Sequence, residues 1–247
     1  MLLASFLPVA SGTRGIVRDN GAVVAIAGVG MLAVASRMNR KRALRQQQLE
    51  ELGEGAVDLG SLNVVTDNGF HRTAIHRDRA SVPLRHLKSK HPEMLQGRLL
   101  DFGSGKGRDC KVIRATCYDP HHPKGSVRRK PTGKYEAVMM TYVANVLPPA
   151  QRAKAIKEAS SYVRTGGTIV IATRSTSDPG LQAAKKWRRH HDGYAQFQGA
   201  KLKRFQKFYT QSSLNKEVAN VLGARFVPVR ISRPGGHTEM VAYRRIR

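Results

Sequence analysis

The stretch with the clearest chemistry is Leu99–Gly107, which reads LLDFGSGKG. Its apolar start has the pattern of a buried strand, and Asp101 comes near the end of that strand. Glycines at 103, 105 and 107 allow positive φ and let the backbone approach a ligand that a Cβ would keep away. In open α/β sheets, ligands bind at the carboxyl ends of the strands, where this loop would lie. The stretch therefore predicts the binding of a nucleotide-like cofactor.

Two known phosphate loops share some of these letters, and both fit poorly. A P-loop requires a glycine five residues before Gly105, where the chain has Leu100, and a Ser or Thr at the position of Gly107. A dinucleotide fingerprint would need its third glycine at the position of Arg108. A glycine-rich turn without a ligand is the remaining alternative.

Elements that could position this loop follow along the chain. Residues 117–119 predict a second strand that ends in Asp119, and residues 135–147 predict a further strand and the loop after it. Apolar and small residues recur at helical spacing from Pro149 to Arg164, and Gly166-Gly167 has the pattern of a C-terminal cap. The pattern predicts alternating strands and helices.

The remaining strands are predicted from β-branched and turn residues. Residues 168–173 form a β-branched run typical of a buried strand. Residues 224–232 and 239–243 flank Pro234-Gly235-Gly236 and predict an antiparallel hairpin that closes the sheet. A helix is expected to start at Thr210 to Ser213, above Phe208 and Tyr209.

From about residue 70 onward, this order of parts resembles the class I S-adenosylmethionine-dependent methyltransferases, in which an acid and G-x-G-x-G follow the first strand. The resemblance implies an α/β fold with a Rossmann-like sheet and S-adenosylmethionine as the cofactor. It also implies that Asp119 accepts hydrogen bonds from the cofactor ribose. Tyr142 and Asn145 are the candidate catalytic residues, which would orient the acceptor. The implied cofactor-binding residues are Asp101, Gly103, Ser104, Gly105, Gly107, Asp119 and Thr141.

Some short stretches resemble one subgroup of these methyltransferases, and one part of the chain differs from the usual methyltransferase fold. Residues 71–75, the Asp-Pro after the second strand, residues 142–147 and residues 206–210 resemble a prokaryotic and phage group of methyltransferases that includes members associated with DNA phosphorothioation. Between Asp119 and Tyr135 there is too little chain for the usual helix, strand and helix. The sheet is therefore expected to lack one edge strand.

The segment after the strand at 135–141 disfavours the common routes of base methylation. Amino-group methyltransferases of DNA place Asn or Asp, Pro, Pro and an aromatic residue there, whereas this chain has Thr141–Asn145, and Pro148-Pro149 comes later. Cytosine-C5 enzymes use a Pro-Cys nucleophile, and neither Cys110 nor Cys117 follows a proline. Both cysteines are interpreted as reduced packing residues in a reducing compartment, and no metal site is expected.

Charge points to a polyanionic partner. The chain has 43 Lys and Arg against 17 Asp and Glu, a net charge of +26. Cations alternate with aromatic rings from Lys185 to Tyr209, a pattern that suits phosphates and stacked bases. A solvated surface is the alternative for this stretch. The candidate substrate-binding residues are His71, Arg72, Trp187, Arg188, Arg189, Lys203 and Arg204.

An apolar arm precedes the methyltransferase-like region. Residues 21–36 are uncharged and apolar, and a basic cluster follows at residues 37–45. They are expected to form a helix that enters a membrane or packs on a partner, or else a disordered or cleaved arm. The predicted organisation is an arm at 1–60 and a domain at 61–247 with a basic aromatic insert at 176–209. The expected location is cytoplasmic, with a membrane anchor or a place in a virion as options.

Two functions are consistent with these features. The first is a methyltransferase that acts on nucleic acid or on a nucleic-acid-associated substrate. The second is a methyltransferase-like protein without turnover that serves as a basic structural component of a nucleoprotein or membrane-associated particle.

Overall fold

The structure is a computed structural model that describes residues 77–122 and 125–247. The apolar segment 21–36, the basic cluster after it and the candidate residues His71 and Arg72 lie outside the described residues. Within the described ranges, no helix combines the length and the apolar character that a membrane crossing would need.

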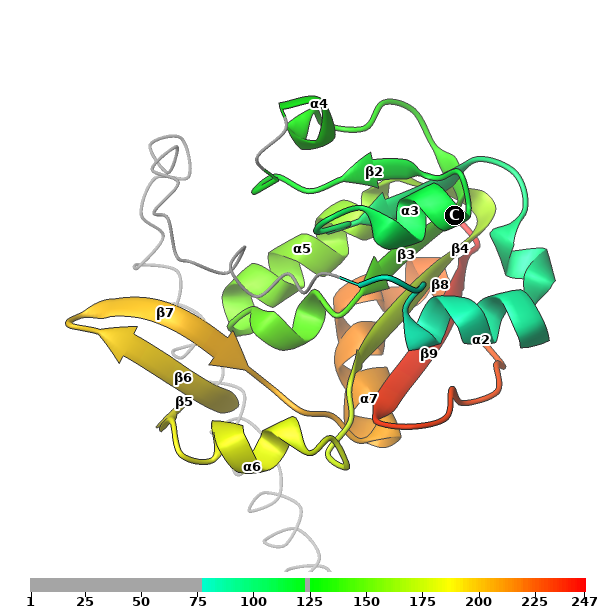
Figure 1. Cartoon of the computed structure of the whole chain (residues 1–247). Helices are drawn as coiled ribbons and strands as arrows, with labels where there is room; N and C mark the ends of the chain where they lie inside the picture. The colour runs from blue at the N-terminus through cyan, green and yellow to red at the C-terminus, as the bar shows by residue number, and fades with distance from the viewer. Residues whose placement is uncertain (1–76, 123–124) are drawn as a thin grey trace, which may run out of the picture. The chain divides into compact units, whose positions relative to one another are not determined.

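A six-stranded mixed sheet forms the centre of the fold, with the strand order β2-β1-β3-β4-β9-β8 (Figure 1). The first four strands in this order are mutually parallel, whereas β9 is antiparallel to both β4 and β8. The strands are β1 (Leu99–Phe102), β2 (Thr116–Tyr118), β3 (Tyr135–Thr141), β4 (Val163–Arg174), β8 (Phe226–Val229) and β9 (Thr238–Arg245).

Helices cover both faces of this sheet, which explains why β3 and β4 are almost continuously apolar. Val138 and Met140 of β3 belong to the core beneath α5 (Pro149–Ser161) and α7 (Gln211–Leu222). Met139 faces the opposite core, beneath α2 (Val82–Lys90). Figure 1 shows α2 on one face of the sheet and α5 and α7 on the other. The alternation of side chains along each strand thus fills two cores.

Short helices and helical turns connect these elements. They are η2 (Pro92–Leu95), α3 (Arg108–Val112), α4 (Gly125–Arg128), η3 (Ala144–Val146), α6 (Gly180–Ala184) and η4 (Gly223–Arg225). The predicted helix start at Thr210 is confirmed, because Thr210 and Ser213 form a capping box at the first turn of α7. The predicted hairpin is also present as β8 and β9.

The expected loss of an edge strand is confirmed. Among the described residues, β2 has β1 as its only strand partner, so β2 is an edge of the sheet. The short helix α4 follows β2, where the full methyltransferase sheet would continue. The sheet therefore ends one strand early on the side of the cofactor loop.

The predicted helix at 149–164 and its glycine cap are wrong in their boundaries. Helix α5 ends at Ser161, and strand β4 runs from Val163 through both glycines to Arg174. Gly166 has φ +79°, and a Cβ on Gly167 would lie 2.9 Å from the carbonyl oxygen of Glu136. The glycines are needed because β4 passes close to the backbone of β3 at a register shift.

The interpretation of the cysteines as reduced packing residues is also wrong. Cys110 in α3 and Cys117 in β2 are joined by a disulfide, with their Cα atoms 5.5 Å apart. This Cα separation is within the usual range for disulfides, and it arises because the chain turns back directly from α3 into β2. The expectation of a reducing compartment was based on free thiols, and the disulfide removes this support for it.

Candidate active site

The glycine loop lies between the ends of β1, β2 and β3. The amides of Gly103 and Ser104 donate to the carbonyl oxygen of Tyr118, at 2.7 and 3.1 Å. Gly103 has φ +78°, and a Cβ there would lie 2.3 Å from Cγ2 of Val143. Gly107, with φ +75°, is the N-cap residue directly before α3. The loop is thus held against β2 on one side and against the segment after β3 on the other.

Asp119 fixes the middle of this loop. Its Oδ2 accepts a hydrogen bond of 2.9 Å from the Gly105 amide, and its Oδ1 accepts one of 2.9 Å from the His121 amide. A carboxylate has about four acceptor sites, so both oxygens retain capacity for a ligand. The family resemblance implies a role for Asp119 at the cofactor ribose, and the structure shows that this carboxylate also holds the cofactor loop.

Asp101 is a buried carboxyl at the end of β1. Burial raises its pKa to about 7, and the charge of Asp109 adds to the effect, while a backbone hydrogen bond from Cys110 opposes it. Asp109 itself accepts a 2.8 Å hydrogen bond from the Ser81 amide, which joins α3 to the start of α2. Near neutral pH, Asp101 therefore changes between a neutral and a charged form beneath the loop.

Tyr142 follows Thr141, the last residue of β3, in an unusual conformation. Its φ is +59°, a value that costs a non-glycine residue free energy and is concentrated at functional sites. Its hydroxyl lies 2.7 Å from Oγ1 of Thr238, and the Arg77 guanidinium lies over its ring at 5.1 Å. Burial raises the pKa of Tyr142. The ring is thereby fixed at the carboxyl end of the sheet.

Asn145 lies in η3 with its side chain almost fully buried, and no described group donates to its Oδ1. Its carbonyl oxygen accepts hydrogen bonds from the Lys207 amide at 2.8 Å and from Nε2 of Gln206 at 3.3 Å. Ser104 Oγ in the cofactor loop also has no partner among the described residues. Buried polar atoms of this kind are normally satisfied, so an ordered water or a polar ligand would complete the hydrogen bonding of both atoms.

The sequence profile of a family described as a methyltransferase domain matches residues 71–221, more than half of the chain. The chain belongs to the methyltransferase domain family. The expected enzyme class and the expected cofactor, S-adenosylmethionine, are both confirmed for this chain. No curated protein matches the sequence.

Several solved methyltransferase structures are similar to this methyltransferase. The 1,6-didemethyltoxoflavin-N1-methyltransferase of Burkholderia thailandensis, bound to S-adenosylhomocysteine, has a TM-score of 0.47 at 16% identity, over 84% of this chain and 89% of that one. DhpI bound to S-adenosylmethionine has a TM-score of 0.46 at 13% identity, over 66% and 84%. The methyltransferase SibL has a TM-score of 0.45 at 13% identity, over 68% of this chain and 55% of SibL.

The residues of the methyltransferase fit its cofactor. The glycine loop leaves backbone surface that side chains would otherwise cover, and Asp119 and Ser104 offer hydrogen-bonding atoms beside it. Asp101 lies beneath the loop, and Thr141 ends the neighbouring strand. The structure therefore places the candidate cofactor-binding residues at the carboxyl ends of the parallel strands β1, β2 and β3 and in the loop between them. Within the described parts of the chain, no three His, Cys, Asp or Glu side chains gather as a metal site would require.

The basic aromatic insert of the methyltransferase is a small antiparallel sheet, ordered β5 (Arg188–His190), β6 (Gly193–Gln198) and β7 (Lys201–Gln206). Its apolar face, with Ala195 and Phe205 at its centre, packs near Leu147. Leu147 ends the segment 142–147 after β3, which we call the acceptor loop because it holds the candidate acceptor-orienting residues Tyr142 and Asn145. Figure 1 shows β6 and β7 projecting beside α5. A hydrogen bond from the Lys207 amide to the Asn145 carbonyl oxygen attaches the insert to the segment that follows β3.

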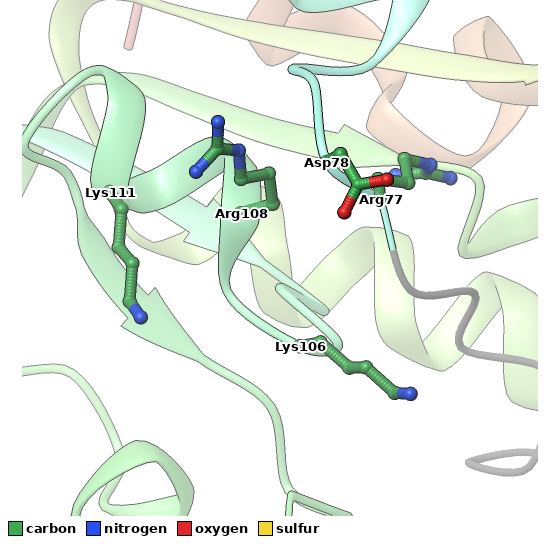
Figure 2. Close-up of a pocket in the computed structure, with 5 residues that line it drawn as sticks. All are labelled: Arg77, Asp78, Lys106, Arg108 and Lys111. Atoms are coloured by element: carbon green, nitrogen blue, oxygen red, sulfur yellow. The ribbon is translucent and has the colours of Figure 1, made fainter.

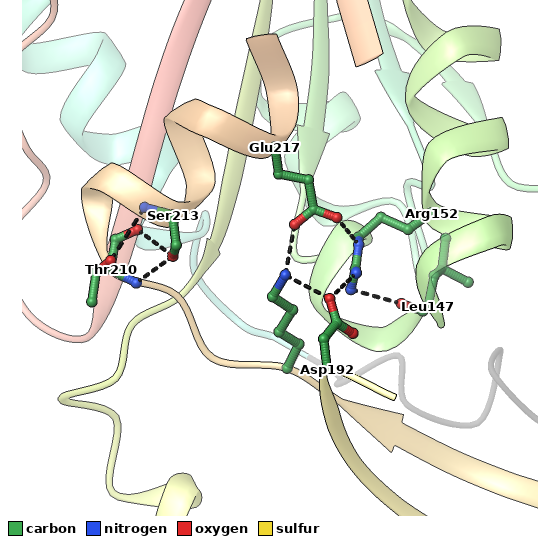
Figure 3. A network of polar contacts seen from close by, with 7 residues as sticks. Leu147, Arg152, Asp192, Thr210, Ser213 and Glu217 are labelled. Atoms are coloured by element: carbon green, nitrogen blue, oxygen red, sulfur yellow. Dashed lines mark hydrogen bonds and ion pairs between the residues drawn. The ribbon is translucent and has the colours of Figure 1, made fainter. Parts of the chain in front are cut away.

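A network of charges fixes the insert to the domain (Figure 3). Arg152 of α5 is 1% exposed and pairs with Asp192 of the insert and with Glu217 of α7. Lys207 bridges the same two carboxylates, with both N–O distances 2.7 Å. Burial opposes the ionisation of Asp192, but the hydrogen bond from Lys207 and the charge of Arg152 outweigh it and lower the pKa. Lys207 is therefore occupied within the protein.

The strand register divides the candidate substrate-binding cations between two faces of the insert. Directly paired residues share a face, so Arg189 lies with Tyr194, and Arg188 lies with Ala195 on the other face. Arg204 pairs with Gln196 and so shares the Tyr194 face, whereas Lys203 is the extra residue at a register shift. Trp187 is half-buried just before β5. The candidate substrate-binding residues of the insert therefore do not lie on one common face.

A cationic hollow lies beside the cofactor loop, and the sequence patterns do not predict it (Figure 2). It has a volume of about 220 Å³ and is lined by Arg77, Asp78, Lys106, Arg108 and Lys111. Lys106 and Arg108 stand within and directly after the glycine loop, so their charge could have been noticed there. Arg77 is distant in sequence, and only the fold brings it to this place.

Proposed function

We propose that this methyltransferase transfers the methyl group of S-adenosylmethionine to nucleic acid. The observation that carries the proposal is the Tyr194 face of the insert, whose opposite, apolar face packs near Leu147. Arg189 lies over the Tyr194 ring at 4.8 Å, and Arg204 is on the same face. No carboxylate among the described residues forms an ion pair with either arginine. Unpaired cations beside a ring suit the phosphates and bases of a single strand.

Methyl transfer makes few demands on the protein beyond positioning. The cofactor supplies an activated methyl group on a sulfonium. The carbonyl oxygen of the Asn145 side chain can accept a hydrogen bond from an N–H or O–H group of the acceptor, because no described group occupies it. Tyr142 presents a fixed ring on which a base can stack. Together, these residues would orient the acceptor toward the cofactor loop.

The test is transfer of radiolabelled methyl groups to single-stranded DNA, duplex DNA, RNA and protein. We expect label in a nucleic acid, with lower transfer in Asn145→Ala. Arg189→Gln with Arg204→Gln should flatten the dependence of log K on log salt by about 1.4–1.8 units, at 0.7–0.9 per phosphate contact. Arg188→Gln, the same kind of charge change on the other face, is the control.

Three outcomes would count against the proposal. Label found only in protein would assign a protein acceptor, including one bound to nucleic acid. Binding of S-adenosylhomocysteine without transfer to any polymer would favour the structural role without turnover. A loss of slope in the Arg188→Gln control that is as large per removed charge as in the double variant would show that the Tyr194 face has no special part in binding.

We also propose that residues 21–36, which lie outside the described residues, attach the protein to a membrane or a larger assembly. The uncharged run and the basic cluster after it support this, and the resemblance to a prokaryotic and phage group would fit such an assembly. Removal of residues 1–45 should release the protein into the unattached fraction while the unfolding midpoint stays unchanged. Failure of the truncated chain to fold would make the run a core element.

A further inference from the structure

The cationic hollow, defined by Arg77, Asp78, Lys106, Arg108 and Lys111, is built from three separate parts of the chain. Arg77 and Asp78 precede α2, Lys106 is in the glycine loop, and the other two side chains are on α3 (Figure 2). Four of the five lining residues are cations. The hollow is therefore produced by the fold and is more than a run of basic sequence.

Three cations of the hollow lack acidic partners in the part of the chain that the structure describes. Within residues 77–122 and 125–247, no carboxylate forms an ion pair with Lys106, Arg108 or Lys111. The nearest acid in sequence, Asp109, is buried and accepts a hydrogen bond from the Ser81 amide. Four cations and one carboxylate, Asp78, line the hollow, so its net charge is positive and the cations repel one another. An anion bound between them would relieve this repulsion.

The size and donors of the hollow fit a phosphate group. A volume of about 220 Å³ is several times the roughly 30 Å³ share of a liquid water molecule, enough for a phosphate with part of its hydration shell. Arginine can donate two parallel hydrogen bonds to phosphate oxygens, and lysine adds a compact charge. The lining includes no aromatic side chain among the described residues, so a base would find no stacking surface there.

We propose that the cationic hollow binds a backbone phosphate of the acceptor strand and thereby sets which nucleotide reaches Tyr142. This inference rests on the proposed function. Arg77 links the two places, because it lines the hollow and also lies over the Tyr142 ring at 5.1 Å. A strand anchored at the hollow would continue toward the acceptor loop, and the insert would contact it separately.

The test compares Arg108→Gln/Lys111→Gln with the control Lys154→Gln/Lys157→Gln. The control pair has the same spacing and charge and lies on α5, which covers the opposite face of the sheet. With a 12-nucleotide oligothymidylate, the hollow variant should lose about 1.4–1.8 units of the slope of log K against log salt, at 0.7–0.9 per phosphate. The control should keep the wild-type slope, and both should bind S-adenosylhomocysteine within about twofold of wild type.

The outcomes separate this inference from the proposed function. If the wild type binds the oligonucleotide and the two variants have equal slopes, the hollow binds no phosphate. If the affinity for S-adenosylhomocysteine falls in the hollow variant, the hollow serves the cofactor and the inference is wrong. No oligonucleotide binding by the wild type would overturn both proposals, whereas slope loss in the hollow variant without methyl transfer would overturn the proposed function alone.

Discussion

Replacing Gly103 by alanine should show how closely the cofactor loop packs on the acceptor loop. The substitution acts in two ways. Gly103 has φ +78°, and an alanine in this left-handed region costs about 1–2 kcal/mol. The added Cβ would also lie 2.3 Å from Cγ2 of Val143, and overpacking of this kind costs about 1–3 kcal/mol. The expected total loss of unfolding free energy is about 2–5 kcal/mol.

A matched glycine separates the two effects. Gly236 has φ +76°, and nothing lies within 4 Å of the place where its Cβ would be. Gly236→Ala should therefore lose only the conformational part, about 1–2 kcal/mol. Adding Val143→Ala to Gly103→Ala should restore part of the lost stability, with a coupling free energy of about 0.5–3 kcal/mol.

Urea unfolding of these variants and of Val143→Ala alone measures the stabilities, and calorimetry with S-adenosylhomocysteine measures the state of the loop. Gly103→Ala should weaken binding, because relief of the contact moves the loop, whereas Gly236→Ala should bind normally. Equal losses in the two glycine variants, or no coupling to Val143, would refute the packing argument.

Three further predictions concern the same region. Asp119→Asn should weaken S-adenosylhomocysteine binding at least about tenfold by calorimetry, because the Gly105 and His121 amides donate to different oxygens of the carboxylate and an amide replaces one of these oxygens by an NH2 group, which cannot accept; unchanged affinity would contradict this. Reduction of the Cys110–Cys117 disulfide, which closes a sequence separation of 7, should cost about 2–3 kcal/mol in urea unfolding, and an unchanged midpoint would count against it. The Asp101 carboxyl titrates near pH 7 in the folded protein and near 3.8 in the unfolded chain, so the folded form holds the proton more tightly and stability falls as the pH rises from about 4 to 7. Asp101→Asn should reduce that fall in unfolding experiments between about pH 4 and 7, and an identical pH profile would show that another group is responsible.

Much of the fold could be predicted because its signals are local. The apolar run before Gly103 and the spacing of the three glycines define β1 and its loop without reference to any distant residue. The cap at Thr210 is likewise a pattern within one short stretch, Thr210 to Ser213. Even the missing strand could be inferred, because it follows from the length of chain between Asp119 and Tyr135.

Features that depend on distant neighbours could not be predicted. Gly166 and Gly167 have the pattern of a helix cap, and only the approach of Glu136 shows that they belong to a strand. The division of the insert into two faces depends on strand register, which a basic sequence does not specify. Arg77 joins the acceptor region through its position over Tyr142, a residue far along the chain.

The place of β9 in the sheet has a consequence for how the protein is made. Strand β4 ends at Arg174, and its antiparallel partner β9 begins at Thr238, 64 residues later (238 minus 174). At synthesis rates of about 5–20 residues per second, about 3–13 s pass between the synthesis of the end of β4 and that of the start of β9. Throughout that interval one edge of the apolar segment Ile169–Ala172 is unpaired, with the insert and α7 emerging ahead of its partner. We expect this edge to be the site at which chaperones bind the nascent chain, and at which chains stalled within the insert aggregate.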